Sequence, residues 1–301
     1  MRKKNPLDYF KSRANQNGFK YLIGSGLAFS LMSICVKAVG EKIPVAELVF
    51  ARAFISIIIT RLLIFKKNII NPWGEQRKLL FLRGILGTGA LFCIFKALTI
   101  LPIATATVIQ YIYPTFTVLC AYFILKESIT KGIIISVIFG WTGIFLVAQP
   151  EWNLNENILG TLFALFIALL GALLTSLAYI CVRKLSEKEH PLIIIYYFPL
   201  ISIPISVPFI IKDFVLPSGT DWIWILGIGL FTQIGQLCIT EGLRLIPAGQ
   251  ATSLNYSQVI FASLWGVLFF QEPLTSNIYW GGLCVLISTI ISMNAPKSLK
   301  V

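Results

Sequence analysis

Long apolar runs alternate with short polar connections along the whole chain. Ten runs of roughly 17–24 residues are each long enough to cross a hydrocarbon core of about 30 Å as a helix. They lie near 19–39, 46–65, 79–99, 103–125, 132–148, 158–182, 192–211, 222–243, 248–270 and 277–294. Because lipid offers backbone groups no water to bond, we expect every run to be helical. The pattern predicts an all-α polytopic membrane protein with ten transmembrane helices.

The composition agrees with lipid as the solvent. Of the 301 residues, 56% are hydrophobic and only 13% are charged, whereas a soluble domain carries about 25% charged residues. The formal net charge of +12 would by itself suggest nucleic acid. Most Lys and Arg residues stand between apolar runs, however, as in proteins oriented by the positive-inside rule. We therefore expect contact with membrane lipid and no nucleic-acid partner.

The basic residues gather in alternate connections. They occur at 66–78, 126–131 and 183–188, in the tail 1–18 and in the tail 297–301, while the other connections are nearly bare. The positive-inside rule then predicts both termini in the cytoplasm. No signal-peptide cleavage pattern follows the first run, and Lys/Ile/Asn-rich usage hints at a bacterial inner membrane.

Residues for enzymatic or metal chemistry are scarce. The six cysteines stand singly inside apolar runs, and the only histidine, His190, lies in a polar connection. No paired-cysteine or His-rich spacing indicates a zinc site, and no phosphate-binding loop with Lys-Ser/Thr occurs. We expect no metal, no cofactor, no catalytic residues and no ATP hydrolysis by this chain.

The second half of the chain repeats the first. A shift of 145 residues lays 101–130 on 246–275 without a gap, matching Pro102 with Pro247, Tyr111 with Tyr256 and Glu127 with Glu272. The predicted repeats are 19–150 and 151–296. Each holds five spans, an odd number, so the second copy starts on the opposite side of the membrane. Inverted repeats of this kind fit alternating access, which favours transport over other functions.

The matched segments are FKALTILPIATATVIQYIYPTFTVLCAYFILKESIT and TEGLRLIPAGQATSLNYSQVIFASLWGVLFFQEPLT. They resemble the drug/metabolite transporter superfamily, in particular its EamA-type ten-helix transporters. The shared pattern comprises Ala97-Leu98, Leu101-Pro102, Pro114 and Glu127, then Gly242-Leu243, Ile246-Pro247 and Glu272. The resemblance implies ten helices around a central cavity and amphiphilic metabolites or amino acids as cargo. Val259 stands where a second mid-helix proline would fall, so the two halves need not bend alike.

Two charged residues in apolar runs occupy equivalent repeat positions, Lys96 and Glu241. A charge at mid-membrane costs about 2.5–3.5 kcal/mol on insertion scales, so such residues are candidates for function. We interpret them as a pair that opens to hold the carboxylate and ammonium of a zwitterion, or Glu241 as the carrier of a coupling proton. A buried structural ion pair is one alternative. A snorkelled position in contact with water is another, because both residues lie about one turn from a helix end.

Other charges within apolar runs are interpreted differently. Glu47 and Arg52 lie five residues apart on one span and either compensate each other or take part in gating and coupling. Arg61 and Arg83 lie near predicted cytoplasmic span ends, so we expect their side chains to reach the interface rather than the interior.

Polar and aromatic residues mark the middle of the fourth and ninth spans. Such side chains avoid lipid and face a bundle interior or a water-filled cavity. Aromatic faces with amide donors suit an organic ligand, although helix–helix hydrogen bonds would use the same residues. The substrate-binding candidates here are Gln110, Tyr111, Tyr113, Asn255, Tyr256 and Gln258, joined by Gln236 from the eighth span.

Three residues of the repeat pattern are candidates for gating. Glu127 and Glu272 close the two matched segments at span ends, where a carboxylate can accept backbone N–H bonds or pair with a nearby lysine. Pro114 frees a backbone carbonyl within its span and offers a hinge.

These features predict a secondary transporter that moves a zwitterionic or aromatic, amino-acid-like metabolite by alternating access. A channel or receptor is the alternative, and a polytopic membrane enzyme is a weaker one because no ionisable cluster lies at one interface. The sequence does not distinguish proton coupling from metabolite exchange, or a monomer from a homodimer.

Overall fold

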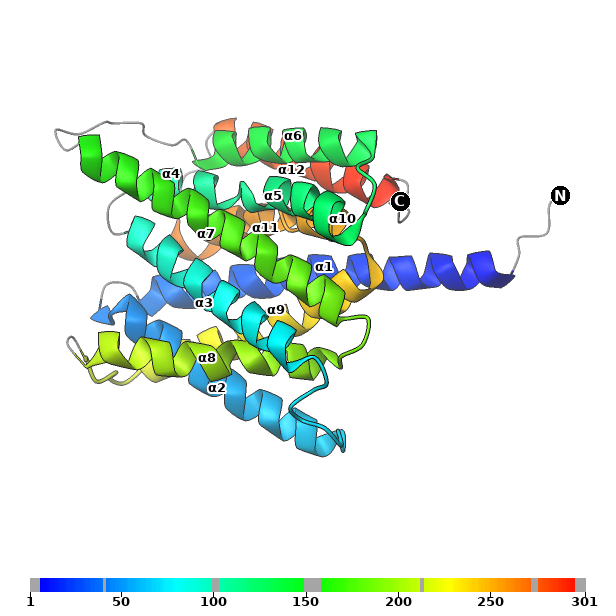
Figure 1. Cartoon of the computed structure of the whole chain (residues 1–301). Coiled ribbons are helices and arrows are strands. Elements are labelled where there is room, and N and C mark those ends of the chain that lie inside the picture. The colour runs from blue at the N-terminus through cyan, green and yellow to red at the C-terminus, as the bar shows by residue number, and fades with distance from the viewer. Residues whose placement is uncertain are drawn as a thin grey trace.

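The computed structural model describes residues 6–39, 42–98, 103–148, 158–211, 214–271 and 276–295. The first half of the chain forms α1 (Pro6–Val39), α2 (Val45–Lys66), α3 (Arg77–Leu98), α4 (Ile103–Gln110), α5 (Tyr113–Cys120), a π-helical turn (Ala121–Leu125) and α6 (Lys131–Ala148). The second half forms α7 (Ile158–Leu185), α8 (Pro191–Ile210), α9 (Asp221–Leu245), α10 (Ala248–Leu254), α11 (Ser257–Phe270) and α12 (Ser276–Asn294). The fold is all-α, as predicted (Figure 1).

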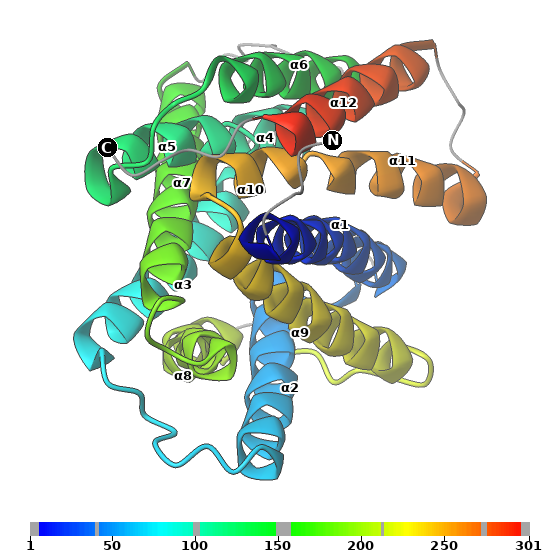
Figure 2. The same cartoon turned by 90° about the vertical axis from the view of Figure 1, so that its right-hand side faces the viewer.

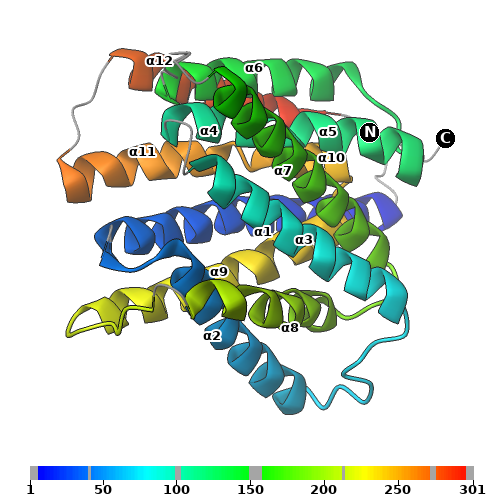
Figure 3. The same ribbon diagram turned by 60° about the vertical axis from the view of Figure 1, so that its left-hand side comes forward.

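The helices have the length and hydropathy of membrane spans. Within the described residues, eight candidate spans are long and apolar enough to cross a bilayer. The two other expected spans are α3, which carries four basic residues, and α10–α11, which a turn divides. Both run alongside the eight in the same bundle (Figure 3).

The two halves pack against each other in matched pairs. Helix α1 packs on α9, and its repeat equivalent α7 packs on α3; α6 packs on α12, and α2 on α8. Figure 2, which looks along many of the helices, shows α6 and α12 at one edge of the bundle and α2 and α8 at the other. Each half therefore lacks a complete interior without the other, as expected for duplicated halves.

Close helix approach depends on small residues at these contacts. A Cβ atom at Gly143 would meet the backbone of α12, and one at Gly281 would meet the backbone of α6. A side chain at either position would push the two helices apart, so glycine allows the α6–α12 contact between the halves.

Both breaks in the helical spans lie at equivalent places. The α4–α5 span breaks at 111–112 and the α10–α11 span at 255–256. Proline follows only the first break, and the halves, which need not bend alike, both break although only one has the proline. At the second break, the Asn255 and Tyr256 N–H groups donate to the carbonyls of Thr252 and Ser253, three residues back. This tighter 3₁₀ spacing ends α10 without proline.

The bundle has two chemically different ends. We define the basic end as the one that carries the α2–α3, π-turn–α6 and α7–α8 connections, at the right of Figure 1. Helix α1, at 34 residues, is about 51 Å long, and its first turns project beyond the other helices at this end (Figure 1).

Candidate functional site

Four tyrosines from three spans form a continuous row between the halves. The ring centroids of Tyr179 and Tyr113 are 5.6 Å apart, those of Tyr113 and Tyr111 are 6.2 Å apart, and those of Tyr111 and Tyr256 are 6.2 Å apart. We call these residues the tyrosine row. It begins on α7 and passes both helix breaks, so the breaks place aromatic faces in the interior rather than toward lipid.

Polar atoms at the second break remain without partners among the described residues. The Tyr256 hydroxyl, the Asn255 Oδ1 atom and the Ser257 hydroxyl are buried and lack a hydrogen bond of normal geometry. The Trp141 side chain lies near the Tyr256 hydroxyl, and the Asn255 side chain lies near the Tyr113 hydroxyl. Buried polar groups normally find partners because leaving one unpaired costs about 1–3 kcal/mol. Several unpaired groups together indicate a place where water or a ligand is bound.

Arg83 lies in the interior, so the expectation that its side chain reaches the interface is wrong. The residue is 4% exposed. Its Nη2 atom donates to Gln236 Oε1 over 3.1 Å, and its Cζ atom lies 5.0 Å from the Phe198 ring centroid. Gln236 stands nine residues before the end of α9, about 13 Å from the basic end. The guanidinium therefore points into the bundle.

Arg52 approaches the same phenyl ring from α2. Its Cζ atom lies 5.4 Å from the Phe198 centroid. Glu47 does not compensate it, because the Glu47 carboxylate is buried and accepts the Val215 N–H over 3.1 Å. We call Arg52 and Arg83 the arginine pair; both guanidinium groups contact the Phe198 ring.

The arginine pair is not neutralised by the surrounding protein. Arg83 Nε and Nη1 and Arg52 Nε are buried without a hydrogen-bond partner in the part of the chain that the structure describes. A charge at mid-membrane costs about 2.5–3.5 kcal/mol, whereas a cation–π contact offsets about 0.5–2 kcal/mol. Two such contacts cannot balance two charges that also repel each other. Tyr179 lies near both arginines, which brings the arginine pair close to the tyrosine row.

Lys96 and Glu241 are not brought together. Lys96 is exposed in the last turn of α3, at the end opposite the basic end. Glu241 lies near the basic end of α9, 3.7 Å from the Arg244 guanidinium. A two-fold axis in the membrane plane places equivalent residues at opposite depths, so positions near helix ends separate. The structure does not form the expected pair.

A charged cluster closes the basic end between the halves. Glu127 Oε1 lies 3.2 Å from Arg183 Nε, and Glu127 Oε2 accepts the Ala248 N–H over 2.9 Å. Arg183 Nη1 donates to the carbonyls of Leu243 and Arg244 over 2.7 and 2.8 Å. The guanidinium thus caps the C-terminus of α9, and the carboxylate caps the N-terminus of α10. We call the Glu127–Arg183 pair with these backbone bonds the latch.

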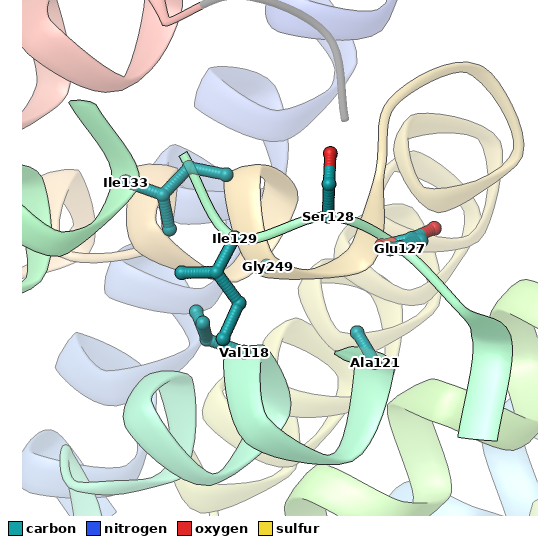
Figure 4. Close-up of a pocket in the computed structure, with 7 residues that line it drawn as sticks. All are labelled: Val118, Ala121, Glu127, Ser128, Ile129, Ile133 and Gly249. Carbon is teal, nitrogen blue, oxygen red and sulfur yellow. The ribbon is translucent and has the colours of Figure 1, made fainter. Parts of the chain in front are cut away.

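Little free space remains beside the latch. Figure 4 shows a cavity of about 10 Å³ between α5, the 127–129 connection and α10, bordered by Val118, Glu127 and Gly249. A single water needs at least that volume, so this cavity is too small for an organic cargo. Burial raises the pKa of the Glu127 carboxyl, although the Arg183 guanidinium opposes that shift.

The remaining candidates lie around this framework. Gln110 ends α4 beside the first break and is half-buried, and Gln258 is half-buried in the first turn of α11. Pro114 is buried in the first turn of α5, where it follows the break. Glu272 falls outside the described residues.

Sequence reasoning missed three residues of the site, Tyr179, Phe198 and Arg183. The first two belong to aromatic-containing apolar runs in which no local pattern marks the interior face. Arg183 stands beside Lys184 in a basic connection, and its contact with Glu127 spans 56 residues.

The architecture defines the class: a polytopic membrane protein of two inverted repeats, with broken helices and polar groups at the interface of the halves. Residues 16–149 and 162–294 each match the EamA-like transporter family. The chain belongs to that family and is a membrane transporter.

Known proteins match most of this chain in sequence or in fold. The chain is 30% identical to human solute carrier family 35 member G1 over 284 residues, covering 91% of this chain and 78% of that protein. It is 26% identical to the pseudopaline exporter CntI of Pseudomonas aeruginosa over 293 residues, covering 97% and 99%. A protein of known crystal structure superposes with a TM-score of 0.82 at 15% identity, covering 93% of this chain and 96% of that one.

Proposed function

We propose that the protein moves a small organic metabolite by alternating access, with the arginine pair and the tyrosine row as its binding site. The observation that carries the proposal is the break of both repeat-related spans beside the tyrosine row. Broken helices at the repeat interface are where secondary transporters bind their cargo. The Tyr256 hydroxyl and the Asn255 side-chain Oδ1 atom supply the polar groups that would orient it.

An aromatic or amphiphilic cargo fits this lining. Tyrosine faces stack on flat or apolar groups, and their hydroxyls bond polar ones. One relative, CntI of Pseudomonas aeruginosa, is an exporter of pseudopaline. The zwitterion-holding role expected of Lys96 with Glu241 is not part of the proposal, because these residues lie at opposite ends of the bundle. Glu241 keeps a separate candidate role in proton coupling.

The latch would be one of two gates. The positive-inside rule assigns the basic end to the cytoplasm of a bacterial cell, with both termini there. The repeat assigns an equivalent gate to the other end: Glu272 matches Glu127, and Lys37 in the last turn of α1 matches Arg183. Opening one latch and closing the other would expose the site to each side in turn.

Counterflow in proteoliposomes tests the transport proposal. Purified full-length protein would be assayed with labelled aromatic metabolites, amino acids and organic acids, with and without a pH gradient. We expect saturable exchange of at least one compound, which falls in a Tyr111→Ala variant. The matched control is Tyr122→Ala, since Tyr122 follows on the same span but is 45% exposed on the outer surface. Ion leak without saturable exchange would contradict alternating access and would support a channel mechanism.

A further inference from the structure

The charge of the cargo follows from what surrounds the arginine pair. Arg83 carries five N–H donors, and its hydrogen bond in the described chain goes to Gln236. The titratable groups near Arg83 are Tyr179, Cys181 and Arg52. None of these three residues is an acid with a carboxylate.

Several described carboxylates bind other groups, away from the arginine pair. Glu47 accepts a backbone N–H at 215, and Glu189 accepts the backbone N–H groups of residues 75 and 76. Asp221 accepts from Ser218 and lies 3.8 Å from the Lys42 ammonium. Glu127 and Glu241 pair with Arg183 and Arg244. No contact among the described residues brings any of these acids to the arginine pair.

We propose that the arginine pair is the anion-binding part of the transport site and that the cargo is a small organic acid of net negative charge, bound through its carboxylate. This inference rests on the proposed transport function. A carboxylate between the guanidinium groups would accept hydrogen bonds from their unpaired N–H groups, since guanidinium geometry matches carboxylate oxygens. Its negative charge would also offset the positive charge of the arginine pair. The tyrosine row, which comes near the arginine pair at Tyr179, would hold the organic body of the same molecule.

A zwitterion is disfavoured at this position. An amino acid would bring an ammonium group into a site that already contains two buried guanidinium groups. No described carboxylate contacts the arginine pair to compensate that third cation. We therefore expect the site to select ligands by net negative charge and not by the presence of an amino-acid group.

The test uses four phenyl compounds that differ in charge and the full-length protein in detergent at constant ionic strength. The probes are 3-phenylpropionate, phenylalanine, phenethylamine and 3-phenylpropanol, with succinate as an anion without a ring. Binding is measured by ligand-induced shift of the unfolding temperature, and exchange is measured by counterflow. We expect 3-phenylpropionate or succinate to bind at least about tenfold more tightly than the zwitterion and the amine, as loss of a charge-assisted hydrogen bond implies.

Variants identify the residues responsible. Arg52→Gln and Arg83→Gln should each weaken anion binding by about tenfold or more, and Arg83→Lys should restore part of it because the charge remains. The matched control is Arg61→Gln, since Arg61 lies on the same helix as Arg52 but is exposed. Anion binding by that control should change less than about twofold, because exposed charges contribute little.

The outcomes separate the two proposals. If neither anion binds, or if Arg52→Gln and Arg83→Gln bind it as the unsubstituted protein does, the anion inference is overturned. Saturable exchange of phenylalanine or the alcohol that survives both substitutions would overturn it while leaving the transport proposal standing. Folded protein that exchanges no compound in either assay would remove both.

Discussion

The latch at the basic end gives a quantitative prediction for Glu127→Gln. The glutamine keeps the shape of the side chain and can still accept the Ala248 N–H, but it has no charge. Hydrogen bonds to charged groups contribute about 1.5–3 kcal/mol and neutral ones about 0.5–1.5 kcal/mol. Two charge-assisted bonds weaken, those from Arg183 Nε and from Ala248 N. The closed state should lose about 2 kcal/mol, which is a shift of roughly 30-fold toward opening of this end.

A native cysteine reports the opening. Cys181 is buried, lies two residues before Arg183 on α7, and is close enough to Arg83 to interact electrostatically. In a variant whose other five cysteines are replaced, the rate of Cys181 labelling by a small maleimide measures access from the basic end. If the open and closed states exchange rapidly compared with labelling, Glu127→Gln should raise that rate by up to about 30-fold.

The control is a second buried carboxylate at the same end. Glu189 accepts the backbone N–H groups of Glu75 and Gln76 but holds a connection rather than helix ends of both halves. Glu189→Gln should leave Cys181 labelling nearly unchanged. Unaltered labelling in Glu127→Gln, or an equal increase in both variants, would refute the latch.

Acid should act on the latch in the same direction. Burial raises the pKa of the Glu127 carboxyl against the opposing effect of Arg183, so protonation as the pH falls would remove the charge that holds the latch. As the pH falls, the Cys181 labelling rate of the protein that retains Glu127 should approach the rate of Glu127→Gln at the same pH. A ratio between the two that stays constant with pH would contradict this.

Three further predictions concern stability. Arg52→Met should raise the unfolding temperature of the ligand-free protein by about 2 °C. The two guanidinium groups lie within about 10 Å of each other, as their contacts with one ring require. At that distance they repel by about 1.6 kcal/mol at an effective dielectric constant of 20. This repulsion exceeds the roughly 1 kcal/mol of cation–π attraction that the substitution removes. Arg61→Met should change it little, and a lower unfolding temperature for Arg52→Met would mean that the arginine pair is structural. Gly140→Ala should cost about 1–3 kcal/mol, because its methyl group would overlap a fully buried tyrosine ring, while Gly282→Ala meets no atom within 4 Å and should be neutral or stabilising; equal effects in thermal unfolding would contradict the packing argument. Burial and then the neighbouring Lys67 lower the pKa of His190, whose neutral Nδ1 accepts a backbone N–H in the first turn of α8. The cap is present above the pKa of histidine in the unfolded chain, about 6.5, and is lost as the pH falls through the lower pKa of His190 in the folded protein. The free energy of unfolding should therefore decrease between pH 7 and 5. The decrease should be smaller in His190→Asn.

Hydrophobic patterning was sufficient to predict the bundle, because lipid forces each apolar run into a helix. The duplication was predicted from residue matches at a shift of 145 residues. Hydrophobic patterning also placed Tyr111 and Tyr256 in the interior, since polar groups avoid lipid. It did not predict the second break, where a 3₁₀ turn at Asn255 replaces the proline that marked the first. Such a turn depends on tertiary packing and has no strong local signature.

The charged residues show where sequence distance misleads. Arg83 stands six residues from the start of α3, close enough to suggest the interface, but its partners Gln236 and Phe198 come from other helices. Lys96 and Glu241 match along the chain, yet inversion converts that match into separation in depth. A signal for the arginine pair was present in the sequence: neither Arg52 nor Arg83 has an acid three or four residues away on its own helix.

Helix α7 links the proposed site to the latch. Tyr179 and Arg183 are four residues apart, so they lie one turn apart on the same face of a helix. Tyr179 contacts the Tyr113 ring and interacts with the arginine pair, while Arg183 holds the ends of α9 and α10. An anion that draws the arginine pair and Tyr179 together must shift or rotate this helix and therefore change the Arg183 geometry. Ligand binding can shift the equilibrium between the open and closed latch only as far as the ligand's affinities for these two states differ. Because α7 carries both Tyr179 and Arg183, it can couple the geometry of the binding site to that of the latch.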